Sequence, residues 1–75
     1  HAMTFKTITE VCEAVKAGKV VHWGTRNYVV ILDNVGQWLI GYNHGQHNAS
    51  YVGLFWLDGV TTDYNPEDFF VAFAG

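Results

Sequence analysis

The chain has 75 residues, of which 49% are hydrophobic, 16% aromatic and only 15% charged, with a net charge of −3. This composition excludes a disordered chain, which needs low hydrophobicity and high charge, and the length suits a single domain over residues 3–75. The acidic balance argues against general nucleic-acid binding, and no apolar run is long enough to span a membrane.

The first residues of the chain and its cysteine content indicate the compartment in which the protein is found. We interpret His1 and Ala2 as a cloning remnant that precedes Met3. A single cysteine cannot form an internal disulfide, and the sequence shows no secretory leader. Both observations favour a reducing compartment, so we expect a cytoplasmic location.

The first predicted element is a helix over residues 7–17. Thr7 and Glu10 have the spacing of a capping box, in which each side chain accepts a hydrogen bond from the other residue's backbone N–H. Gly18 suits the left-handed position just after a helix. The apolar residues between them recur at i, i+3, i+4 and i+7, which is one helical face: Ile8, Val11, Cys12 and Val15.

Short β-type runs follow the helix, separated by turn residues. We predict strands over 20–23, 28–32, 38–42 and 51–57. Asp58-Gly59 is typical of a type I′ turn and predicts a hairpin into residues 60–62. Residues 65–68 read as the start of one helical turn, and the run from Phe69 to Phe73 predicts a short edge strand.

These elements predict an α+β fold, with one N-terminal helix packed on a curled antiparallel sheet of four to five strands. The middle strands carry apolar residues on both faces, and one short helix can cover only one face. The other face must curl on itself or meet another chain, so we expect a homodimer. The expected contacts are aromatic residues that face outward: Trp38, Tyr42, Phe55 and Phe73.

The sequence contains little that could support catalysis or metal binding. His44 and His47 lie in a polar loop without further strong ligands nearby, and zinc needs three or four. Cys12 is expected to be buried and inert. No nucleophile elbow, phosphate loop or dinucleotide motif is present. We therefore expect a protein that is not an enzyme and needs no cofactor and no metal.

A candidate binding site lies at the first turn of the predicted sheet. Trp23 and Tyr28 flank this turn, Arg26 lies within it and His22 adjoins it. Two rings and a cation at a loop tip are suited to clasping a flat anionic ligand such as a nucleotide. Ordinary packing at strand ends is the competing interpretation.

Charge is divided unevenly along the chain. The first 26 residues hold all four Lys and Arg against two acids, a net charge of +2. The remaining residues hold five acids and no Lys or Arg, a net charge of −5. Two such patches would suit a protein partner or head-to-tail contact.

Four segments carry a resemblance to known proteins: residues 17–23, 28–30, 58–60 and 67–70. Together they are similar to segments of short accessory proteins of tailed phages. More distantly, the helix, Gly-Lys and strand opening and the acidic-hydrophobic close are similar to phage sponge proteins that inhibit Thoeris defence by sequestering a nucleotide signal. Those proteins have a basic residue soon after Gly-Lys and Asp-Trp near the end, where this chain has His22 and Ala72-Phe73.

The resemblance implies a phage-encoded protein with a counter-defence role in the host cytoplasm. We expect a small non-enzymatic binding protein that inhibits a host protein by occupying it. One alternative is a sponge for a small nucleotide, and another is a structural subunit that forms oligomers.

Overall fold

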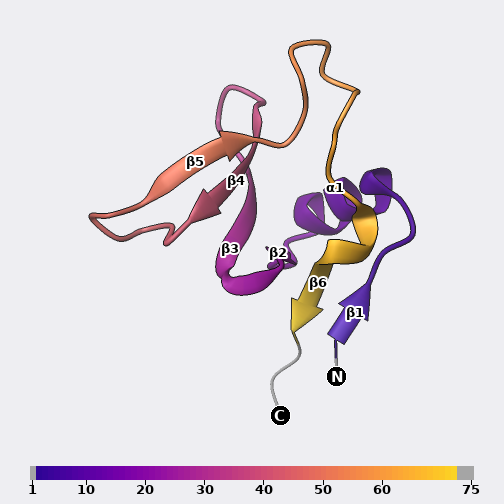
Figure 1. Ribbon diagram of the computed structural model, residues 1–75, viewed down its shortest axis with the longest axis horizontal. Helices are drawn as coiled ribbons and strands as arrows, with labels where there is room; N and C mark the ends of the chain where they lie inside the picture. The colour runs from indigo at the N-terminus through magenta and orange to yellow at the C-terminus, as the bar shows by residue number, and fades with distance from the viewer. Residues whose placement is uncertain (1, 73–75) are drawn as a thin grey trace.

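The computed structural model describes residues 2–72. All six strands form one antiparallel sheet in the order β1-β6-β2-β3-β4-β5, and helix α1 packs on it (Figure 1). The predicted α+β fold is confirmed, with six strands in place of four to five. The elements are β1 (Ala2–Thr4), α1 (Ile8–Lys16), β2 (His22–Trp23), β3 (Thr25–Leu32), β4 (Trp38–Tyr42), β5 (Ser50–Gly53), the 3₁₀ turn η1 (Pro66–Asp68) and β6 (Phe69–Ala72).

Local signals at both ends fix the bounds of α1. The Glu10 backbone N–H donates to the Thr7 hydroxyl at 3.1 Å, and the Thr7 N–H donates to the Glu10 carboxylate at 3.3 Å. After the helix, Gly18 has a φ of +91°, and the N–H of Lys19 donates to the Ala14 carbonyl at 3.0 Å. These are a capping box and a Schellman-type end, so the predicted helix is confirmed.

The C-terminal strand β6 is not at the edge of the sheet, and this part of the prediction is wrong. It lies between β1 and β2, where Val71 pairs with Met3 and Phe69 pairs with Trp23. Strand β1 was not expected, and it includes Ala2, which we had set aside as a cloning remnant. Both differences arise because these pairings join distant parts of the chain, and local sequence patterns carry no signal for them. The predicted strand also ran to Phe73, which lies outside the described residues.

The strand predicted over 51–57 stops at Gly53, and residues 54–65 form a loop. The Asp58 carboxylate accepts hydrogen bonds from the backbone N–H groups of Val60, at 2.9 Å, and Thr61, at 2.8 Å. The Thr61 hydroxyl also donates to it. A short acidic side chain that binds nearby backbone groups competes with strand pairing, which explains why no second hairpin strand forms.

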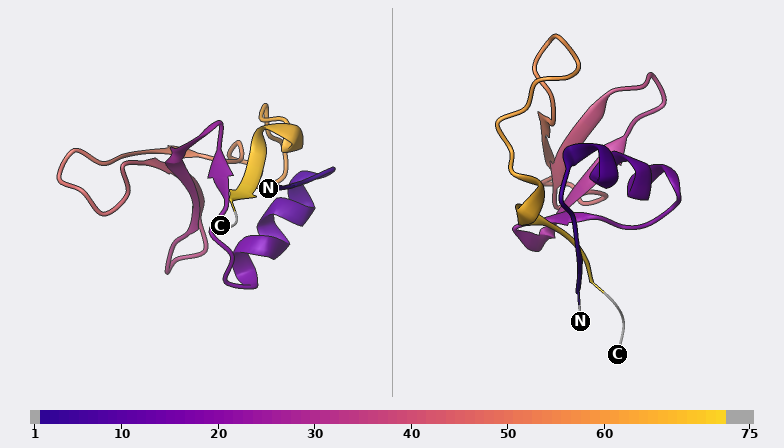
Figure 2. Two further views of the ribbon diagram at one scale, coloured as in Figure 1. Left: turned by 90° about the horizontal axis from the view of Figure 1, so that it is seen from below. Right: turned by 90° about the vertical axis from the view of Figure 1, so that its right-hand side faces the viewer.

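The hydrophobic core lies between α1 and one face of the sheet (Figure 2). We call this sheet face the core face. The buried hydrophobic residues described are Phe5, Val11, Ala14, Val21, Val30, Ile40, Leu54, Phe69 and Val71.

Within residues 2–72, the chain forms no helix of the length and hydropathy that a membrane span requires.

The opposite face of the sheet, which we call the outer face, is not covered by α1. Its strand register aligns His22, Val29, Gly41 and Tyr51 across four strands. A Cβ atom at Gly41 would lie 2.8 Å from Cε1 of Tyr51, so the tyrosine ring lies over this glycine. The outer face is therefore filled in part by its own side chains.

Candidate functional site

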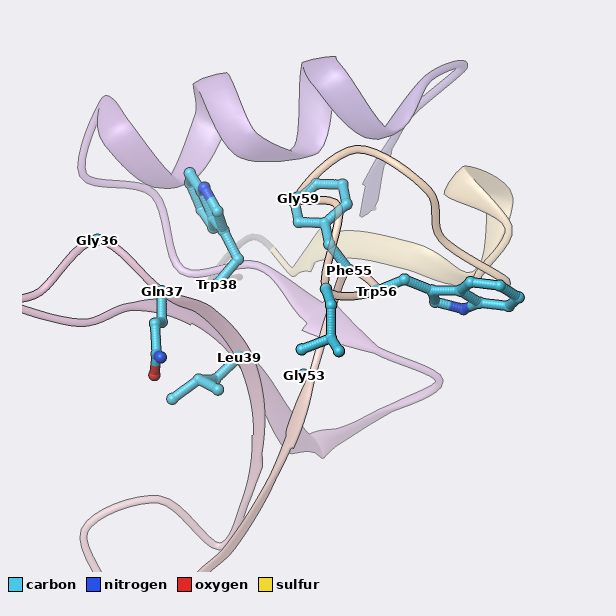
Figure 3. A pocket seen from close by; sticks show the side chains of 9 residues that line it. Gly36, Gln37, Trp38, Leu39, Gly53, Phe55, Trp56 and Gly59 are labelled. Atoms are coloured by element: carbon cyan, nitrogen blue, oxygen red, sulfur yellow. The ribbon is translucent and has the colours of Figure 1, made fainter.

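An open pocket with a volume of about 510 Å³ lies beside the loop over residues 54–65. It is bounded by the β3–β4 turn, by the first residues of β4 and by the chain that leaves β5 (Figure 3). None of the lining residues is charged. Those with large side chains are Gln37, Trp38, Leu39, Phe55, Trp56 and Leu57.

Two aromatic rings make the fixed part of this pocket. Trp38 and Phe55 are half-buried, pack against the core and point toward α1 (Figure 3). The ammonium group of Lys16, in the last turn of α1, lies 6.0 Å from the centroid of the Trp38 ring. Trp38 is thus held by the core and by α1, and Phe55 by the core, so this side of the pocket is formed before any ligand arrives.

Three apolar side chains on the loop form what we call the rim: Trp56, Leu57 and Val60. They expose 60%, 109% and 76% of their surface, respectively. The Trp56 indole N–H donates to the Asp63 carboxylate at 3.2 Å, which holds its ring away from Trp38 and Phe55 (Figure 3). Exposed large apolar side chains on one loop are typical of an interaction surface.

The turn in this loop depends on an ionised carboxylate. Hydrogen bonds from the Thr61 side chain and from the Thr61 and Val60 backbone lower the pKa of Asp58 below its ordinary value of 3.8. A carboxyl group with a lowered pKa stabilises the folded loop above that ordinary value, and this contribution is lost as the pH falls through the lowered pKa. The rim is therefore held in place at neutral pH.

Among the described residues that line the pocket, the large side chains are mostly apolar or aromatic, and none is ionisable. Within residues 2–72, no three His, Cys, Asp or Glu side chains gather where they could hold a metal ion. Cys12 lies on α1, and burial raises the pKa of its thiol, an effect that nearby Lys16 partly opposes. This arrangement can bind an apolar group of a partner.

At the site predicted for the first turn, the fold brings Trp23 and Tyr28 into contact but does not place Arg26 between them. Trp23 and Tyr28 are in edge-to-face contact, with ring centroids 5.0 Å apart and an interplanar angle of 90°. They fill the space that a clasped ligand would need. Arg26 is exposed and belongs to β3 rather than to the turn.

His22 lies on the outer face, away from Trp23. Its Nδ1 is 3.0 Å from the Tyr28 carbonyl oxygen, and its ring centroid is 5.3 Å from that of Phe70. Neighbouring residues of a strand point to opposite faces, which separates these two side chains. Trp23 instead packs on the core face, where its ring lies at 85° to that of Tyr64 and its buried indole N–H finds no hydrogen-bond partner among residues 2–72. Such perpendicular contacts allow an N–H to meet an aromatic face.

The aromatic residues expected at a dimer interface do not point outward. Trp38 and Phe55 pack against the core, and the half-buried Tyr42 lies against Tyr28, with centroids 4.9 Å apart. The expectation that they face outward is wrong, because Trp38, Ile40 and Tyr42 share the core face of β4. Phe73, the fourth expected contact, lies outside the described residues.

Sequence reasoning missed the rim because residues 54–57 continue the apolar pattern of β5. The one available signal was Asp58, whose side chain can turn the backbone and so expose the apolar residues on either side.

Comparison with protein-family models, with curated proteins and with solved structures finds no match for this chain.

Proposed function

We propose that this protein is a non-enzymatic binding protein that occupies the surface of a partner protein through the pocket and its rim. The observation that supports this proposal is the exposure of Trp56, Leu57 and Val60 beside a pocket without charged lining. Tryptophan is enriched among the residues that dominate binding energy at protein interfaces. A volume of about 510 Å³ would accept one or two apolar side chains of the partner.

The partner we propose is a host protein, and the effect of binding is its inhibition. This part of the proposal comes from the resemblance to phage accessory proteins, which implies a counter-defence role. Inhibition by occupancy requires affinity and shape but no catalytic group. A pocket with two aromatic rings packed against the core meets that requirement, because these rings need no reorganisation before binding.

The nucleotide sponge has less support from the geometry. Its clasp would need Trp23 and Tyr28 to separate, and these rings are in contact. Heating the purified protein and measuring ultraviolet absorbance in the supernatant tests this alternative directly. A released compound with nucleotide absorbance would favour the sponge over the protein binder.

The test of the proposed function compares three proteins in pull-downs from a host lysate, followed by mass spectrometry. They are the wild type, Trp56→Ser and Val20→Ser. Val20 is the matched control, because it is an apolar residue 57% exposed outside the loop. We expect a protein that is enriched by the wild type and by Val20→Ser and is lost with Trp56→Ser.

Titration with the purified partner then gives the affinity. Trp56→Ser should raise the dissociation constant by at least about tenfold, since loss of a central aromatic anchor costs more than 1.4 kcal/mol. Far-UV circular dichroism should stay native in both variants, because both side chains are exposed. Equal affinity of the wild type and Trp56→Ser would remove the rim from the proposed site.

A further inference from the structure

The open edge of β5 carries backbone groups that point away from the sheet. The Leu54 N–H donates to the Trp38 carbonyl at 3.0 Å, so Leu54 directs its N–H toward β4, while its carbonyl accepts a hydrogen bond from the Thr62 hydroxyl at 2.7 Å. In an antiparallel pair, successive residues direct these groups alternately toward the partner strand and away from it. Ser50 and Val52 therefore bond to β4, whereas the N–H and C=O groups of Tyr51 and Gly53 face outward at the edge.

Nothing in the sequence of β5 protects this edge. Natural sheets protect exposed edges with charged side chains, proline or a covering segment. Strand β5 reads Ser-Tyr-Val-Gly, with every residue exposed, and residues 34–57 contain no Asp, Glu, Lys or Arg. The other edge, β1, has three residues, and Lys6 follows it closely. The β5 edge is therefore the one suited to pairing with a further strand.

We propose that β5 pairs antiparallel with β5 of a second copy of this chain, about a two-fold axis at Val52. In this register, Tyr51 of each copy lies opposite Gly53 of the other copy. The outward N–H of each residue then donates to the outward C=O of the residue opposite it. A two-fold contact of this kind is closed, and it leaves no unpaired β5 edge for further growth.

The side chains of β5 suit this register. Tyr51 already lies over Gly41 on its own β4, where no side chain obstructs its ring. In the dimer, the residue opposite Tyr51 across the new contact is also a glycine, Gly53 of the second copy. Val52, which is 53% exposed, meets its own copy at the axis, where the side chains of a non-hydrogen-bonded pair come closest.

The charge distribution is compatible with a second copy at this edge. Each chain carries a net charge of −3, and repulsion between two copies is smaller where the residues that meet carry no charge. The stretch from 34 to 57 is such a region. A four-residue strand covers less than the roughly 800 Å² per partner of a standard interface, so we expect a dissociation constant in the micromolar range.

Sedimentation equilibrium over about 1–500 μM protein tests the dimer, in the concentration range that a micromolar affinity requires. The apparent molecular mass of the wild type should rise with concentration from 8.4 kDa toward twice that value. Val52→Lys places two ammonium groups together at the axis and should raise the dissociation constant by at least about tenfold. Val20→Lys, at a similarly exposed valine, should dimerise as the wild type does.

Amide hydrogen exchange of the wild type tests the register. At high concentration the N–H groups of Tyr51 and Gly53 should be protected, and on dilution they should exchange rapidly while Val52 stays protected by β4. A single 8.4 kDa species at every concentration would overturn the proposal. So would a dimer that survives Val52→Lys with Tyr51 and Gly53 unprotected, or protection that appears only when an extended peptide of another protein is added.

Discussion

At the scale of single residues, Cys12 shows how position on a helix sets reactivity. Its side chain is half-buried and packs against the core, and burial raises the pKa of the thiol from its ordinary value of 9.0. Lys16 lies one turn further along α1, and its positive charge lowers the pKa of Cys12, which partly opposes the effect of burial. Because the thiolate is the reactive form, a raised pKa lowers the reactive fraction at any pH below it.

We predict that Cys12 in the folded protein reacts with a disulfide reagent at pH 8 at least about tenfold more slowly than in the urea-unfolded chain. Lys16→Ala should slow the native reaction further, because it removes the charge that favours the thiolate. Lys19→Ala is the matched control and should leave the rate unchanged. The measurement is the absorbance of the released thiol over time, and equal rates in the folded and unfolded protein would contradict the prediction.

At the scale of elements, the sequence predicts structure well where the determining contacts are local. The ends of α1 depend on groups within five residues of one another, and β4 has the bounds expected from its apolar run. The loop over 54–65 differs from the predicted hairpin because the Asp58 side chain binds the backbone of Val60 and Thr61. The same Asp-Gly pair is compatible with a hairpin or with this turn, and the sequence pattern does not distinguish them.

Helix α1 provides a direct test of a local signal. Thr7→Ala removes the hydroxyl that accepts from the Glu10 N–H and should reduce the free energy of unfolding by about 1 kcal/mol. Thr9→Ala is the control, since Thr9 is exposed within the same helix and alanine is the better helix former. The urea midpoint should fall for Thr7→Ala and hold or rise for Thr9→Ala. An unchanged midpoint for Thr7→Ala would show that the cap does not stabilise the protein.

At the scale of the whole molecule, the order of the strands explains what local patterns could not. Strand β6 joins β1 to β2, so the two ends of the chain complete the sheet together (Figure 1). The same limit applies to the candidate site. Trp38 and Phe55 were identified as aromatic contacts from the sequence, but only the fold shows that they form the base of a pocket beside an exposed rim.

The position of β6 leads to a prediction about global stability. An edge strand can lose a side chain at modest cost, whereas β6 lies inside the sheet, with Phe69 fully buried between the strands and α1. Phe69→Ala should reduce the free energy of unfolding by about 3–5 kcal/mol, through lost burial and the cavity left behind. A 75-residue domain has about 4–11 kcal/mol in total, so this variant should be close to unfolding in buffer.

Phe70→Ala is the matched control for that prediction. Phe70 is the next residue of β6, but it is half-buried on the outer face beside His22, so its loss should cost only about 1–2 kcal/mol. Urea unfolding followed by far-UV circular dichroism measures both variants. If Phe69→Ala lost no more stability than Phe70→Ala, Phe69 could not be buried on the core face, because that burial is what separates these two adjacent residues.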